Sequence, residues 1–86
     1  MPEISRFFGI VIKMYFDDHL PPHFHAEYGE YKAVVDILTL VAFGGYLPPR
    51  ALGMVIEWAS EHREELLVLW ERACNGQPLY KLPPLV

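Results

Sequence analysis

The sequence predicts an α+β domain, in which a small antiparallel sheet of about three strands in the N-terminal half is covered on one face by two C-terminal α-helices. Three observations predict this class. β-Branched and aromatic residues fill strand-like stretches in the N-terminal half, apolar residues recur at helical spacing in the C-terminal half, and proline or glycine pairs separate the segments. With 86 residues the chain has the size of one domain, which we assign to residues 1–86.

The first predicted strand covers residues 9–16, GIVIKMYF, and is followed by the Asp17-Asp18 pair. Its β-branched and aromatic composition is typical of a strand. Alternation would place four large apolar side chains on one face, namely Ile10, Ile12, Met14 and Phe16. The next residues, DDHLPP, indicate a turn, because proline cannot donate a hydrogen bond to a sheet.

Residues 23–28 and 31–37 are predicted to be the two strands of a β-hairpin. Gly29-Glu30 between them suits a type II′ turn, because glycine tolerates the positive φ of the first loop position. This register gives an apolar face that would meet the helices, with Tyr28 opposite Tyr31, Ala26 opposite Ala33 and Phe24 opposite Val35. The other face, which would look outward or into a cleft, has Glu27 opposite Lys32, His25 opposite Val34 and His23 opposite Asp36.

Residues 38–47, LTLVAFGGYL, fit either a short connection or an edge strand, because Gly44-Gly45 interrupts them. Pro48-Pro49 then begins a helix at about 49–59. Its apolar stripe consists of Leu52, Val55, Ile56 and Ala59, with Met54 and Trp58 beside it.

The second helix is predicted at about 61–75, with Ser60 as its N-cap and Asn75-Gly76 at its C-terminal end. Its buried residues would be Leu66, Leu69, Trp70 and Ala73. The tail at residues 77–86 is apolar and interrupted by proline, so we expect it to lie extended across the domain or across a partner.

Seven Lys and Arg against eleven Asp and Glu give a net charge of −4. Nucleic acid is therefore not expected as a partner of this chain by itself, because phosphates require basic residues. No stretch has the length of a membrane span. Cys74 is the only cysteine and is expected to be buried, and the lack of disulfides favours a cytoplasmic location. A short chain that is 52% hydrophobic leaves apolar surface uncovered, which predicts a small protein partner or a homodimer.

Three histidines fall within seven residues of HLPPHFHAEY. His23 and His25 are two residues apart on a predicted strand, so both imidazoles would point the same way. His19, just before the turn, could swing toward them. Three protein ligands with an open position are typical of catalytic zinc. His19, His23 and His25 are therefore candidate ligands for zinc or another divalent transition metal.

A carboxylate near these histidines would complete several kinds of site. Asp36, or with less support Asp17 or Asp18, could bind the metal or fix an imidazole tautomer. Without a metal, His23 and Asp36 are candidate catalytic residues, with the imidazole as general acid and base. The alternative is a solvated sheet face or an interface, because His-x-His on a strand is a weak motif. His62, in the first turn of the second helix, is expected at the surface or in packing.

Three segments of the chain together resemble one bacterial family. They are ISRFFGIVIKMYFDDHLPPHFHAEYGEYKAVVDI, LPPRAL and EWASEHREELLVLWERA, and the family is domain of unknown function 4160. The resemblance covers almost the whole chain. Family members carry the same residue types at His19, Pro21, Pro22, His23, Phe24, His25, Tyr28, Gly29, Trp58, His62, Leu66 and Trp70. In this chain LVAFGGYLPP replaces the more polar, acidic hairpin of many members.

The family name implies no activity, and what the resemblance implies is mainly a gene arrangement. Such genes are often found beside a second small domain of unknown function, numbered 2442, in a tandem that is similar to toxin–antitoxin modules. We therefore expect a protein-interaction module that is one half of a toxin–antitoxin-like pair. The alternative from another class is a small metal-dependent hydrolase or nuclease, in which the HLPPHFH histidines hold a metal that activates water.

Overall fold

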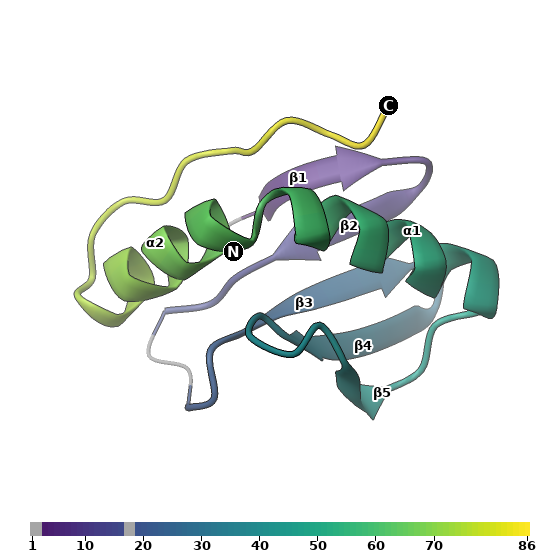
Figure 1. The fold of residues 1–86 in the computed structure, drawn as a ribbon, viewed down its shortest axis with the longest axis horizontal. Helices are drawn as coiled ribbons and strands as arrows, with labels where there is room; N and C mark the ends of the chain where they lie inside the picture. The colour runs from purple at the N-terminus through teal and green to yellow at the C-terminus, as the bar shows by residue number, and fades with distance from the viewer. Residues whose placement is uncertain (1–2, 17–18) are drawn as a thin grey trace.

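The structure, a computed structural model, describes residues 3–16 and 19–86, which form a five-stranded antiparallel sheet followed by two helices (Figure 1). The strands lie side by side in chain order: β1 (Glu3–Phe7), β2 (Ile10–Lys13), β3 (His23–Tyr28), β4 (Tyr31–Asp36) and β5 (Ala42–Gly45). The helices are α1 (Pro49–Glu61) and α2 (Arg63–Cys74). The predicted α+β class is confirmed. The predicted number of about three strands is wrong, because β1 and β5 add a strand at each edge of the sheet.

β1 is missing from the sequence prediction because its turn to β2 carries an unusual residue. The turn consists of Phe8 and Gly9, with φ of 49° and 81°. Positive φ at both positions is typical of a type I′ hairpin turn, where phenylalanine is rare. A register shift between Glu3 and Ser5 also breaks the simple alternation of β1, so that Ile4 and Ser5 are both buried.

β2 ends at Lys13, whereas the prediction extended this strand to residue 16. The predicted face is buried at Ile10, Ile12 and Met14. Phe16 was predicted on the same face and is 41% exposed. The alternation fails there because the chain has already left the sheet.

The β3–β4 hairpin has the predicted register. His23 pairs with Asp36, Phe24 with Val35, His25 with Val34, Ala26 with Ala33, Glu27 with Lys32 and Tyr28 with Tyr31. Gly29 has φ of 59°, as the first position of a type II′ turn requires. Because the register is correct, the apolar face of this hairpin meets the helices, with Phe24 and Val35 fully buried.

The segment at residues 38–47 contains an edge strand, which was one of its two predicted alternatives. β5 pairs with β4, with a register shift between Val34 and Val35. The connection from β4 is held by Asp36, whose Oδ1 accepts hydrogen bonds from the backbone N–H groups of Leu38 and Thr39 at 2.7 and 3.0 Å. This turn places β5 antiparallel to β4 at the edge of the sheet.

α1 buries part of the predicted stripe, namely Val55 and Ala59, together with Trp58, which was expected beside it. Its buried residues are Ala51, Val55, Trp58 and Ala59. The predicted Leu52 is only half-buried, because the large Trp58 side chain takes the centre of the interface with the sheet. The predicted N-cap role of Ser60 is wrong, since α1 continues through it and its hydroxyl donates to the Glu57 carbonyl at 2.7 Å.

α2 buries the predicted residues, which are Leu66, Leu69, Trp70 and Ala73. It ends at Cys74 in a Schellman motif, in which Gly76 has φ of 68° and the Gln77 N–H donates to the Arg72 carbonyl at 2.8 Å. Cys74 was expected to be buried and is exposed. It lies on the side of α2 that faces solvent, next to the buried Ala73.

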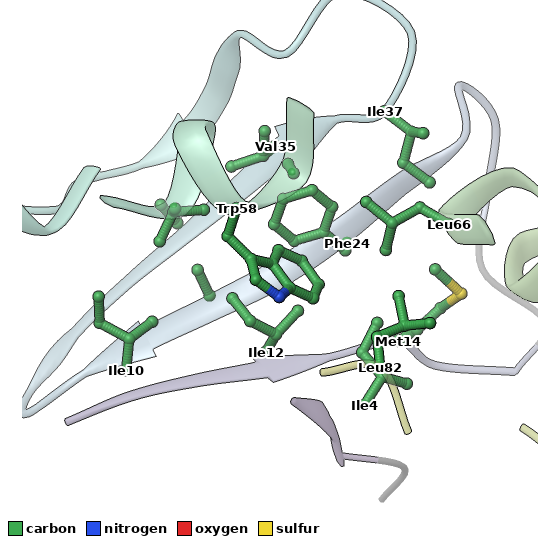
Figure 2. Packing of buried hydrophobic residues seen from close by; sticks show 14 of the residues in the cluster. Ile4, Ile10, Ile12, Met14, Phe24, Val35, Ile37, Trp58, Leu66 and Leu82 are labelled. Carbon is green, nitrogen blue, oxygen red and sulfur yellow. The ribbon is translucent and has the colours of Figure 1, made fainter. Parts of the chain in front are cut away.

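The hydrophobic core lies between the sheet and the helices. Trp58 of α1 is fully buried beside Phe24 of β3, as Figure 2 shows, with ring centroids 5.9 Å apart. Phe7 of β1 lies 5.6 Å from the same indole. The chain after α2 returns across the domain, as Figure 1 shows. Its Leu82 and Leu85 belong to the hydrophobic core, and the Leu82 N–H bonds to the Ile4 carbonyl of β1.

Replacement of Gly45 by alanine is expected to lower the free energy of unfolding by about 2 kcal/mol or more. Gly45 has φ of 74°, and a Cβ there would overlap the backbone carbonyl oxygen of Lys32. Gly53→Ala is the matched control, because an added Cβ at this exposed α1 position meets no atom within 4 Å. It should stabilise the helix by up to about 1 kcal/mol. Urea unfolding measures both, and a Gly45→Ala variant as stable as wild type would contradict this β5 geometry.

Candidate functional site

The histidine-rich segment lies at one end of the sheet, where the chain enters β3. His23 is the first residue of β3 and His25 follows on the same face, as the spacing predicts. Their ring centroids are 5.2 Å apart at an interplanar angle of 66°. The structure therefore brings two of the three candidate metal ligands together.

His23 is enclosed by aromatic side chains from distant parts of the chain. Its ring lies 5.0 Å from Trp70 of α2 and 5.8 Å from Phe43 of β5, and the residue is only 6% exposed. We predicted that this face looks outward or into a cleft. At His23 the prediction is wrong, because Trp70 and Phe43 cover the imidazole.

The backbone fixes the tautomer of His23. Its Nδ1 lies 2.7 Å from the carbonyl oxygen of Pro21. A carbonyl only accepts hydrogen bonds, so Nδ1 carries the proton in this contact. Metal-binding and catalytic histidines are commonly oriented by a hydrogen bond of this kind.

His25 is half-buried on the sheet face that the helices leave open. The ring of Tyr15 meets it edge-on, with centroids 4.5 Å apart. Beside it, Lys13 of β2 forms an ion pair with Glu27 of β3 at 3.2 Å. The surroundings of His25 are therefore more polar than those of His23.

Asp36 lies directly opposite His23 in the hairpin register, as predicted. Its Oδ1 accepts the two backbone hydrogen bonds that close the β4–β5 turn. The role that the structure gives this carboxylate is to hold the turn, since Asp side chains commonly bond to nearby backbone N–H groups. An additional role in orienting His23 stays a prediction.

The remaining candidate ligands are His19 and the carboxylates of Asp17 and Asp18. His19 is exposed in the segment that leads to β3. Asp17 and Asp18, the other predicted carboxylates, lie outside the described residues. Within residues 3–16 and 19–86, no three His, Cys, Asp or Glu side chains lie together in an arrangement that could hold a metal ion.

His62 lies between the two helices, away from the sheet face of His25. Its ring is 5.2 Å from Trp58, and its Nδ1 lies 3.4 Å from a carboxylate oxygen of Glu65. These contacts give it a packing role at the α1–α2 junction. Sequence reasoning did not identify Trp70, Phe43 and Tyr15 as neighbours of the histidines, because no local pattern connects residues so far apart in the chain.

Comparison with known proteins shows the family. Residues 9–71 match the family described as Domain of unknown function (DUF4160). The chain belongs to this family. The matched range runs from β2 into α2 and contains all four histidines of this DUF4160 domain. No curated protein and no solved structure is significantly similar to the chain. In the part of this DUF4160 domain that the structure describes, neither helix has the length and apolarity needed to cross a membrane.

His23→Ala is expected to lower the free energy of unfolding by about 1–3 kcal/mol. The change empties the space between Trp70 and Phe43 and leaves the Pro21 carbonyl without its imidazole donor. His25→Ala, at a half-buried position, should cost less. Chemical unfolding of both variants measures the difference, and an equal or larger loss in His25→Ala would contradict the structural role of His23.

Proposed function

We propose that this chain is a protein-interaction module that binds a small partner protein, and that the two form a toxin–antitoxin-like pair. One observation carries the proposal, which is a run of large apolar side chains exposed at the β5 edge of the sheet. This β5 apolar surface consists of Leu38, Val41, Phe43 and Tyr46, which are 53%, 57%, 53% and 59% exposed. Apolar side chains gathered in one exposed segment are typical of a protein-binding surface.

The β5 apolar surface lacks the charges that normally protect a sheet edge. Residues 37–49 contain no charged side chain. Soluble proteins usually protect edge strands with lysine, proline, bulges or short length. β5 is short and irregularly paired with β4, which limits uncontrolled pairing, but it leaves Val41 and Phe43 uncovered. A partner that covers these side chains would remove their exposure to water.

Two aromatic members of the β5 apolar surface each contact another ring, Phe43 that of His23 and Tyr46 that of Tyr31, which belong to opposite faces of the sheet. Phe43 meets the His23 ring edge-on at 5.8 Å, and the Tyr46 ring lies 5.7 Å from Tyr31. Side chains that are already fixed lose less conformational entropy on binding. Aromatic residues are also enriched at the centres of protein interfaces. Phe43 and Tyr46 are therefore suited to act as anchors for a partner.

The partner that we propose is the small domain numbered 2442, because the gene arrangement implied by the family resemblance places it beside such chains. Val41→Asp should weaken this complex at least 30-fold, because it places a charge in the middle of the β5 apolar surface. Isothermal titration calorimetry with the purified neighbouring protein measures the change in Kd.

Val68→Asp is the matched control for this experiment. Val68 is a valine of similar exposure, 49%, on the outer side of α2. The same substitution there should leave the Kd within about threefold of wild type, a change well under 1 kcal/mol. Equal weakening by both substitutions would place the interface elsewhere, and the absence of any complex with the wild-type chain would refute the proposed partner.

The second candidate function is a small metal-dependent hydrolase or nuclease that uses His19, His23 and His25, with Asp36 behind them. The specific support for it is the contact between the His23 and His25 rings, together with the Nδ1–H tautomer of His23. Zinc or another divalent transition metal held there would activate water. The acidic net charge of −4 weighs against a nucleic-acid substrate.

The metal content of the purified protein distinguishes the protein-interaction function from the metal-dependent function. We expect protein purified without a histidine tag to contain less than about 0.1 metal equivalent per chain, because two imidazoles bind a metal ion weakly. Elemental mass spectrometry measures this, with a His23→Ala/His25→Ala variant alongside. About one equivalent of zinc or another transition metal in wild type, lost in a variant that keeps its circular dichroism spectrum, would establish the metal-dependent function instead.

A further inference from the structure

The C-terminal tail, residues 77–86, forms several hydrogen bonds to the domain through its main chain. The Leu82 N–H donates to the Ile4 carbonyl at 2.7 Å, and the Ser5 hydroxyl donates to the Leu82 carbonyl at 3.1 Å. The Trp58 Nε1–H donates to the Pro83 carbonyl at 2.8 Å. We call Ile4, Ser5 and Trp58, with Arg72 described below, the tail site. Three of its hydrogen bonds therefore recognise the backbone of an extended segment.

The side chains of the tail divide between core and solvent. Leu82 and Leu85 are 4% and 8% exposed and belong to the hydrophobic core, whereas Pro83 and Pro84 between them are exposed. A segment that buries residues three apart has the periodicity of an extended proline-type helix, which has three residues per turn. A segment that replaced the tail would need leucines at the first and fourth positions of Leu-Pro-Pro-Leu to fill the same space in the core.

The start of the tail is held by a separate contact on α2. The Arg72 Nε–H donates to the Pro78 carbonyl at 2.7 Å, and its guanidinium lies 5.7 Å from the centre of the Tyr80 ring. At the surface, Lys81 lies 3.8 Å from Glu3. The Arg6 side chain hydrogen-bonds Glu3 and holds the pKa of this carboxyl below its ordinary value.

We propose that the tail site is a peptide-binding site for extended Leu-Pro-Pro-Leu-type segments, and that the tail is a built-in ligand which such a segment of a partner protein displaces. The contacts that carry this are directed at backbone groups and at two leucines, so they do not require a covalent link. Proline-rich segments are also favoured ligands, since they are already extended before they bind. This site lies at the β1 edge of the sheet, opposite to the β5 apolar surface, and does not depend on the proposed function.

The covalent link explains why the tail fills the site in the free chain. A short linker gives a tethered segment an effective concentration in the millimolar range. A free peptide with the same contacts competes poorly until the tail is weakened. A partner segment can displace the tail when the partner makes further contacts elsewhere on the domain that increase its affinity. The test must therefore compare the wild-type chain with a full-length chain whose own tail binds badly.

The experiment uses a fluorescein-labelled peptide of residues 77–86, QPLYKLPPLV, and the full-length Leu82→Asp/Leu85→Asp chain. Fluorescence anisotropy should show saturable binding, at least tenfold tighter than to the wild-type chain. A peptide with the same two Leu→Asp changes is the ligand control and should bind at least tenfold more weakly. Adding Ser5→Ala to the chain should weaken peptide binding severalfold, whereas Lys32→Ala, at an exposed position of β4, should not.

A variant chain that keeps its circular dichroism spectrum and does not bind the peptide would overturn the proposal. If the variant does not fold, hydrogen exchange of the wild-type chain tests whether the tail detaches from its site. Exchange of the Leu82 N–H at least tenfold faster than that of Ala26 in the central strand β3 shows that the tail detaches locally, as proposed. Equal exchange rates for the Leu82 and Ala26 N–H groups would show that the tail opens only together with the core, and would overturn the proposal. A wild-type dimer that Leu82→Asp abolishes would assign the site to a second copy and overturn the partner assignment.

Discussion

The burial of the Trp58 indole is the interaction on which both layers of the fold depend. The ring lies 5.6 Å from Phe7 and 5.9 Å from Phe24, so it holds α1 against β1 and β3 together. The same ring contacts His62 at the helix junction, and its Nε1–H binds the Pro83 carbonyl of the tail. Removal of a buried aromatic side chain typically costs about 3–5 kcal/mol. In a domain of this size, that is a large fraction of the net stability.

How far the sequence predicts the fold depends on whether the determinants are local. The β3–β4 register follows from Gly29 and from alternation over twelve neighbouring residues, and it is correct at all six pairs. The end of α2 is also determined locally, by Gly76 directly after the helix. β1 could not be predicted, because Phe8 is not a usual turn residue and because the outer edge of β1 is completed by Leu82, 77 residues away from Ser5. Contacts over such distances leave no periodic signal in a single sequence.

In the candidate site, too, the features set by local spacing could be predicted and those set by long-range contacts could not. Spacing alone places His23 and His25 on one face, and their rings do lie next to each other. The burial of His23 depends on Trp70 and Phe43, which come from other elements, so its enclosure could not be read from the motif. For Asp36 the predicted register is correct, but its carboxylate accepts hydrogen bonds from the backbone of the adjacent β4–β5 turn. Nearby backbone N–H groups compete for an Asp side chain before any distant imidazole does.

Phe43 bears on both proposed functions, because it contacts the His23 ring and is also part of the β5 apolar surface. It covers the His23 ring from one side, and its own outer surface is part of the β5 apolar surface. Metal-activated water requires an open coordination position that substrate can reach. His23, only 6% exposed between Phe43 and Trp70, offers little such access, and a partner seated on Phe43 would remove more of it. The enclosed imidazole is therefore better suited to support Phe43 as an anchor for a partner than to hold a reacting metal.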